Sequence, residues 1–232
     1  CVLRCTGQGP LTETTPLIIG GIVKPLATFE NCPAAASSSS TSLNIPTVVQ
    51  TYIQACVYYG VATDAGVLTT LRYRVPELRV SNKFEDKDMI PLADVLCEYW
   101  QTELAYITKL DFTAPARTGY PGLRSHGAVA LAKVINCNTN LLELKLTGSK
   151  IGCYGAKALA PALAKSSIRK LSMHGCAIQA EGAKVFAEHV LRNDGLALRT
   201  LDLSLNNLGW AGTECISEAL QERKLRQLPE VE

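Results

Sequence analysis

The chain has 232 residues, of which 47% are hydrophobic and 19% charged, and its formal net charge at pH 7 is +2. Such a composition is ordinary for a globular protein that buries a sizeable core. The near-balanced charge gives no reason to expect a nucleic acid or an anionic membrane as partner. The sequence contains no apolar run of roughly 18 residues, so it predicts no membrane-spanning helix.

The nine cysteines do not form a disulfide or metal-binding pattern. Free cysteine inside an apolar stretch behaves as a small hydrophobic residue, and most of the cysteines here occur singly in such stretches. Cys1 and Cys5 form one CxxxC motif, which is a weak signal for either a metal or a disulfide. Without a CxxC pair or a histidine at ligand spacing, we expect no metal site, and we expect a reducing, cytoplasmic compartment.

The first 46 residues differ in kind from the rest. Residues 34–42 (AAASSSSTS) are typical of a flexible linker, and the preceding Gly-, Pro- and Thr-rich arm has one apolar stretch, residues 17–26. Residues 47–103 are expected to form an N-terminal helical cap with a degenerate repeat. Within that range the sequence predicts a helix after Pro46, a second short helix, a strand at 75–80 and a helix at 89–100.

Leucine-rich repeats follow at 104–220. A strand at 107–112, an enlarged loop at 114–124 and a helix at 127–135 precede three segments with the pattern LxxLxLxx(N/C)xL. These segments start at Leu141, Ile168 and Leu198, which lie 27 and 30 residues apart. Their ninth positions hold Ser149, Cys176 and Asn206, and amphipathic helical patterns separate them. We therefore predict an α/β fold, a right-handed horseshoe-shaped solenoid with parallel strands on the concave face and helices on the convex face. Residues 221–232 are expected to be a tail without a capping repeat.

The candidates for catalysis are few. Cys176 with His174 could form a nucleophile and base, but we favour Cys176 as the inward-pointing substitute for the repeat asparagine. Glu85, Asp86 and Asp88 are expected in a solvated turn, His126 as a helix cap, and His189 as a solvated residue at a helix end. No phosphate-binding loop or dinucleotide motif is present. We predict no enzyme activity, catalytic residue, cofactor, metal or small-molecule substrate.

The projecting strand positions are the candidate partner-binding surface. Position three reads Glu, Lys, Glu, Lys, Thr along the stack, and position five reads Arg, Asp, Lys, Ser, Asp. Neighbouring strands thus present opposite charges, which could either pair with each other or select a partner. Trp210 is a second candidate, either as a ridge contact or packed in the core. The predicted concave contacts are Lys145, Lys170, Ser172, His174, Asp202 and Ser204.

The three repeat blocks resemble ribonuclease-inhibitor-type leucine-rich repeats. The entry segment TYIQACVYYGVATDAGVLTTL is also similar to that of ciliary and centrosomal repeat proteins, including the leucine-rich subunit of the nexin–dynein regulatory complex. This resemblance implies a protein-interaction scaffold in a larger intracellular assembly, with the ciliary axoneme and cytoskeleton as candidate locations. The alternative is a regulatory partner of an enzyme, such as a GTPase activator, an inhibitor or an immune-sensor recognition domain.

Overall fold

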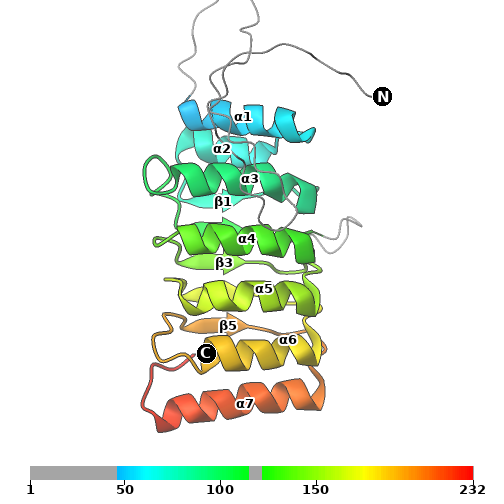
Figure 1. Ribbon diagram of the computed structural model, residues 1–232, viewed down its shortest axis with the longest axis vertical. Helices are drawn as coiled ribbons and strands as arrows, with labels where there is room; N and C mark the ends of the chain where they lie inside the picture. The colour runs from blue at the N-terminus through cyan, green and yellow to red at the C-terminus, as the bar shows by residue number, and fades with distance from the viewer. Residues whose placement is uncertain (1–45, 115–121, 232) are drawn as a thin grey trace, which may run out of the picture. The chain divides into compact units, whose positions relative to one another are not determined.

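The computed structural model describes residues 46–114 and 122–231. Their five strands form one parallel sheet in which spatial order equals chain order (Figure 1). The chain therefore folds as the leucine-rich-repeat solenoid that the repeat spacing predicts. The strands are β1 (Glu77–Arg79), β2 (Lys109–Asp111), β3 (Glu143–Lys145), β4 (Lys170–Ser172) and β5 (Thr200–Asp202).

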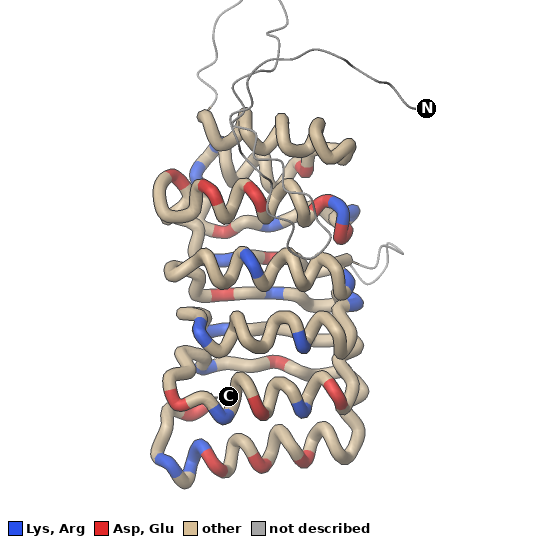
Figure 2. Tube along the Cα trace, in the orientation of Figure 1, with Lys and Arg blue, Asp and Glu red and all other residues tan. Residues whose placement is uncertain are grey.

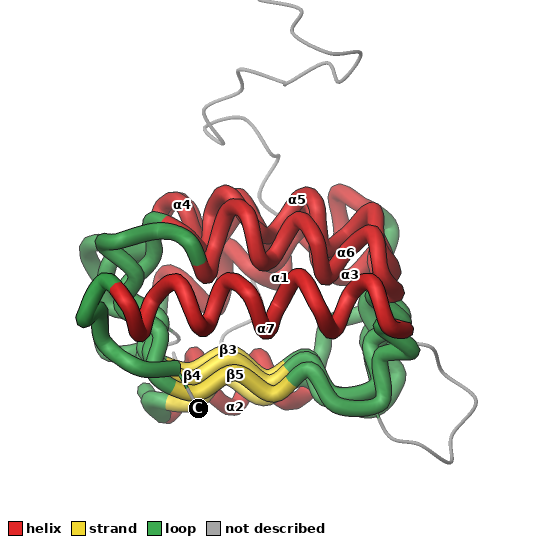
Figure 3. Tube along the Cα trace, turned by 90° about the horizontal axis from the view of Figure 1, so that it is seen from below, coloured by secondary structure: helices red, strands yellow, loops and turns green. Residues whose placement is uncertain are grey.

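Helices α3 to α7 form a layer over one side of this sheet (Figure 3). The leucine at position four of each strand points into the space between the layers, and Leu78, Leu110, Leu144 and Leu171 are all buried. The helices of the stack are α1 (Thr47–Tyr59), α2 (Ala65–Tyr73), α3 (Asp86–Tyr99), α4 (Ser125–Cys137), α5 (Gly152–Ala164), α6 (Gln179–Phe186), η1 (Ala187–Leu191) and α7 (Gly209–Leu225).

Side chains from the α1–α2 region seal the outer edge of β1. Thr70 donates its hydroxyl to the carbonyl of Glu77 (3.2 Å), and the Asp64 carboxylate accepts the N–H of Ser81 (3.0 Å). The same carboxylate caps α2 by accepting the N–H groups of its first turn. Gly66 lets α2 lie close, since a Cβ at this position would be 2.0 Å from the Arg79 carbonyl oxygen. Two of the outward-facing backbone groups at this edge, the Glu77 carbonyl and the Ser81 N–H, are thereby partnered.

The opposite end of the stack is more open. Most apolar side chains of the last repeat are only half-buried, although Leu198 and Ala219 are buried, whereas their counterparts in the preceding repeats are buried. The backbone N–H and C=O groups of successive residues in a strand point to opposite sides. Because the carbonyls of Asp202 and Ser204 accept hydrogen bonds from the β4 side, the backbone groups of Leu201 and Leu203 face the outer edge of the sheet. The half-buried side chains are Leu201, Leu203, Leu208, Ile216 and Leu220.

The final helix extends further than expected. α7 continues to Leu225, into the range 221–232 that the sequence analysis assigned to a tail. Arg223 is 2% exposed, and its guanidinium donates to the carbonyls of Leu191 (2.8 Å), Asn193 (2.8 Å) and Pro229 (3.0 Å). It therefore fastens the segment after α7 to the end of η1, and Val231 packs against the core.

Two local features depart from the sequence analysis. His126 does not cap a helix, because α4 already begins at Ser125 and His126 is an exposed residue of its first turn. Asp86 of the preceding repeat accepts the N–H of Arg124 there instead (2.6 Å). His189 is exposed at the end of its helix, as expected, but this end is the π-helical segment η1 and not a regular α-helical turn.

Candidate functional site

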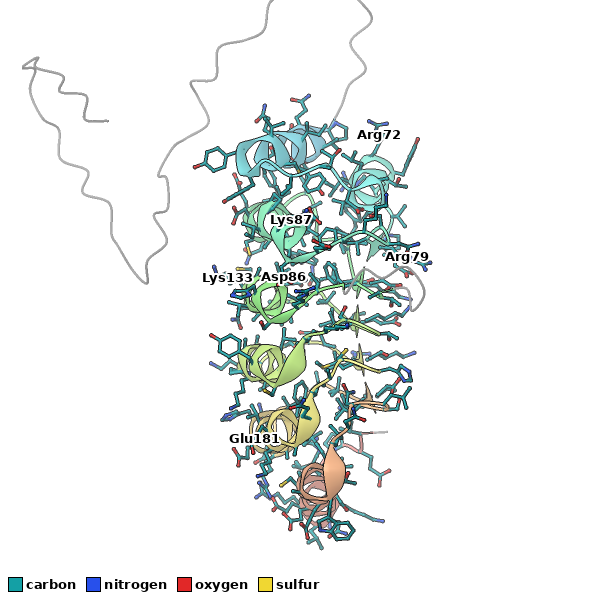
Figure 4. All side chains as sticks on the ribbon, turned by 90° about the vertical axis from the view of Figure 1, so that its right-hand side faces the viewer. Arg72, Arg79, Asp86, Lys87, Lys133 and Glu181 are labelled. Atoms are coloured by element: carbon teal, nitrogen blue, oxygen red, sulfur yellow. The ribbon has the colours of Figure 1, made fainter. Side chains whose placement is uncertain are left out.

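The concave face is the side of the sheet turned away from the helices, formed by positions three, five and seven of the repeats. Figure 4 shows Arg79 on this side of the stack and Lys133 and Glu181 on the helical side. The strands are in register, so position-three residues are aligned from Glu77 to Thr200 and position-five residues from Arg79 to Asp202. The sequence pattern had predicted this alignment.

The charges on β1, β2 and β3 pair with one another. The Lys109 ammonium lies 3.3 Å from one Glu143 oxygen, and the Lys145 ammonium lies 3.5 Å from the other. Lys145 also reaches Glu77 across β2 (3.9 Å), and Arg79 lies 3.8 Å from Asp111. Figure 2 shows acidic and basic residues side by side on these strands. Lys145, a predicted partner contact, is therefore part of an internal charge network.

The charge network on β1, β2 and β3 lowers the pKa of the Glu143 carboxyl group. Its partial burial acts to raise its pKa, but the hydrogen bond from Lys109 and the charge of Lys145 outweigh that effect, and the pKa lies below its usual value. A carboxylate in this state remains ionised at neutral pH and holds both lysines. The N-terminal half of the concave face is thus close to neutral.

On β4 and β5 the polar side chains form a different arrangement. The Thr147 and Ser172 hydroxyls are 3.0 Å apart, and Ser172 donates to Asp202 (3.5 Å). Ser204 donates to the other Asp202 oxygen (2.5 Å) and lies 2.6 Å from Nδ1 of His174. Four of the six predicted concave contacts therefore join in one network, which we call the polar network: Ser172, His174, Asp202 and Ser204, together with Thr147.

Proton counting fixes the tautomer of His174. The single hydroxyl proton of Ser204 is donated to Asp202, so Nδ1 of His174 must donate its own proton to the Ser204 oxygen. Nε2 is then the ring nitrogen free to meet a partner. The hydrogen bonds from the Ser204 hydroxyl and backbone N–H hold the pKa of Asp202 below its usual value. Because the serine lies between the acid and the histidine, this order differs from that of a hydrolase triad.

Three cations at the entry to β4 and β5 have no carboxylate partner among the described residues. Lys170 is the first residue of β4, Arg169 and Arg199 directly precede β4 and β5, and all three residues are exposed. The backbone N–H of Arg199 donates to the Arg169 carbonyl (2.8 Å), which places the two residues side by side. We call these three residues the basic corner. Lys170 was predicted as a contact, whereas the two arginines were not singled out, because they lie outside the regular strand positions.

Position nine carries a structural ladder. Ser149, Cys176 and Asn206 each donate to the position-six carbonyl of the preceding repeat, at 3.1, 3.0 and 2.7 Å. Cys176 is fully buried, and its burial raises the pKa of its thiol to about 12. A buried, protonated thiol that donates to a backbone carbonyl is no nucleophile, so the expected role as substitute for the repeat asparagine is confirmed.

The remaining candidates are placed as follows. Trp210 is the second residue of α7 and 83% exposed, which rules out core packing and leaves the ridge contact as a prediction. Glu85 and Asp88 form a capping box at the start of α3 instead of a simple solvated turn. Cys1 and Cys5 lie outside the described residues. Within the described ranges, no three potential ligands cluster around a metal position. No helix of that part of the chain has the length and apolarity needed to cross a membrane.

Comparison with known proteins supports the repeat assignment. A family model described as "Leucine Rich repeat" matches residues 137–160, 164–187 and 198–217. NACHT, LRR and PYD domains-containing protein 12 of Mus musculus is 32% identical over 98 residues, which is 41% of this chain. The matched part is 9% of that protein, so the chain spans less than a tenth of its length. Leucine-rich repeats of this kind are protein-binding domains.

Proposed function

We propose that this solenoid of leucine-rich repeats is a non-enzymatic scaffold that binds a protein partner through the C-terminal half of its concave face. The observation that carries the proposal is the contrast between the two halves. On β1 to β3 the charges satisfy one another, whereas β4 and β5 present the polar network and the basic corner to solvent. Charged groups that already pair internally have less to gain from a partner.

The polar network also suits recognition because it is rigid. Asp202 accepts hydrogen bonds from Ser172, the Ser204 hydroxyl and the Ser204 backbone N–H, so the orientation of its carboxylate is fixed. His174 is oriented by Ser204 in turn. Side chains that are positioned before binding lose less conformational entropy when a partner docks.

Capture of the native partner tests this proposal. The variant Ser172→Tyr/Ser204→Tyr places neutral bulk on the concave face, while Gln54→Tyr/Gln221→Tyr places the same bulk on exposed positions of α1 and α7. We expect the first variant to lose partners that wild type captures from the native source, and the second to keep them. Circular dichroism confirms that both fold. Loss in the second variant alone would show that the helical ends carry the interaction.

Two cellular roles fit such a scaffold. An assembly role, with the axoneme as candidate, predicts that the protein remains with salt-extracted axonemes; neither comparison concerns a ciliary protein. A regulatory role is compatible with the similarity to a NACHT, LRR and PYD domains-containing protein. As a GTPase regulator, the chain would capture a small GTPase in a nucleotide-dependent way. Fractionation and nucleotide-dependent capture therefore discriminate the two roles.

A further inference from the structure

The basic corner carries charge that no ion pair within the sheet balances, unlike the charged residues of β1, β2 and β3. The carboxylates on the neighbouring strands are already engaged. Glu143 is held by Lys109 and Lys145, and Asp202 by the two serines of the polar network. The basic corner thus carries three cations that no described carboxylate neutralises.

The backbones of the three cationic residues lie next to one another. Register pairs Lys170 with Thr200, the residue after Arg199, and the Arg199 backbone binds that of Arg169. Arg199 is held in place, since its guanidinium donates to the carbonyls of Leu196 (3.3 Å) and Leu198 (2.9 Å). The charge therefore sits at the end of β4 and β5 where the strands begin, adjoining the polar network on the same strands.

From this arrangement we propose that the basic corner binds an acidic segment of the partner protein, which crosses the starts of β4 and β5. The inference rests on the proposed function and adds the chemistry of the partner. Arginine favours carboxylates because its planar guanidinium can hold both oxygens, and Lys170 adds a mobile point charge. Nε2 of His174, the free ring nitrogen, lies farther along the same strand and contacts a polar group beyond the acidic stretch.

A direct binding assay tests this proposal. The probe is a short fluorescein-labelled peptide in which Asp and Glu alternate with Gly, and its matched control has Asn and Gln in place of the acids. Fluorescence anisotropy is measured with wild type, with Arg169→Glu/Lys170→Glu, and with Lys133→Glu/Lys157→Glu. The last variant makes the same charge change on exposed positions of the convex helices α4 and α5.

We expect wild type to bind the acidic peptide and not its amide counterpart. Reversal of Arg169 and Lys170 should weaken binding by about tenfold or more, whereas the convex variant should stay within about twofold of wild type. Equal weakening by both variants would mean attraction by net charge alone and would overturn the proposal. So would tighter binding of a single-stranded oligonucleotide at the same residues, since it would identify a nucleic-acid site.

The experiments distinguish a failure of the acidic-segment proposal from a failure of the proposed concave binding surface. If the acidic peptide does not bind but Ser172→Tyr/Ser204→Tyr still abolishes capture of the native partner, the concave site stands and the acidic chemistry is wrong. If the acidic peptide binds as expected while the tyrosine variant captures every native partner, the basic corner acts outside the proposed scaffold surface.

Discussion

Replacing Asn206 tests whether the ninth-position ladder stabilises the last repeat. Asn206 is 2% exposed, and its side chain both donates and accepts hydrogen bonds. Its amide donates to Met173 O (2.7 Å), and its carbonyl oxygen accepts the N–H groups of Cys176 (2.8 Å) and Ile178 (3.3 Å). Asn206→Leu keeps the approximate side-chain size and removes these three contacts, together with the bonds from the amide to the carbonyls of Leu203 (2.8 Å) and Ser204 (3.2 Å).

The expected loss of unfolding free energy follows from the buried backbone groups that lose their hydrogen-bond partner. Each buried polar group without a partner costs about 1–3 kcal/mol. The longer bond from Ile178 and the half-open end of the stack reduce the sum, so we expect Asn206→Leu to cost about 3–4 kcal/mol of unfolding free energy. Asn206→Cys should cost only about half of that, because Cys176 shows that a thiol can still donate to the position-six carbonyl.

Urea denaturation provides the measurement, with the midpoint and the m value read together. Gln221→Leu makes a similar change on the exposed side of α7 and should shift stability by less than about 0.5 kcal/mol. A fall in the m value of Asn206→Leu would show that the last repeat unfolds on its own. A cost for Asn206→Leu below about 1 kcal/mol, or an equal cost for the Leu and Cys variants, would refute the ladder argument.

Three further predictions concern single groups. Arg223→Met should loosen the segment around Pro229, measured as faster amide hydrogen exchange after α7, with a loss of about 2–3 kcal/mol; unchanged exchange would contradict the anchoring role. Iodoacetamide at mildly basic pH should modify exposed Cys137 in the native protein and spare Cys176, as peptide mass spectrometry would reveal. Asp202→Asn should destabilise at neutral pH and have little effect well below pH 4, because the folded pKa of Asp202 is lowered, so its contribution is present above the unfolded pKa of about 3.9 and is lost as pH falls through the folded pKa. An equal effect at both pH values would disprove this linkage.

Much of the scaffold was predictable from the positions of leucine. Apolar residues at positions one, four and six of a repeat must point into the core. The spacing of these residues therefore predicts the strand register, including the alignment of Glu143 with Lys170. The ninth position was equally informative. Cys176 was correctly assigned as a structural donor because its neighbours in the pattern are Ser149 and Asn206.

The features that sequence did not reveal depend on side-chain reach and on local adjustment. Lys145 extends across a whole strand to Glu77, a contact that no nearest-neighbour comparison of strand positions includes. Arg223 lies in the range that the sequence analysis assigned to a tail, yet its guanidinium turns inward to carbonyl groups. The π-helical turn of η1 lies in a longer repeat, and no residue type predicts such a turn from sequence.

The unequal ends of the sheet decide how this fold can be lengthened. At β1, the outer edge is occupied by Thr70 and Asp64, so a new strand there would have to displace α2 and the cap that starts it. At the other end, Leu228 follows Leu198 by the same 30 residues that separate Leu198 from Ile168, and Val231 already lies against the core. A duplicated repeat unit would therefore extend the sheet from β5 without removing an existing contact. A strand added at an end of the described sheet therefore disturbs fewer contacts beyond β5 than beyond β1.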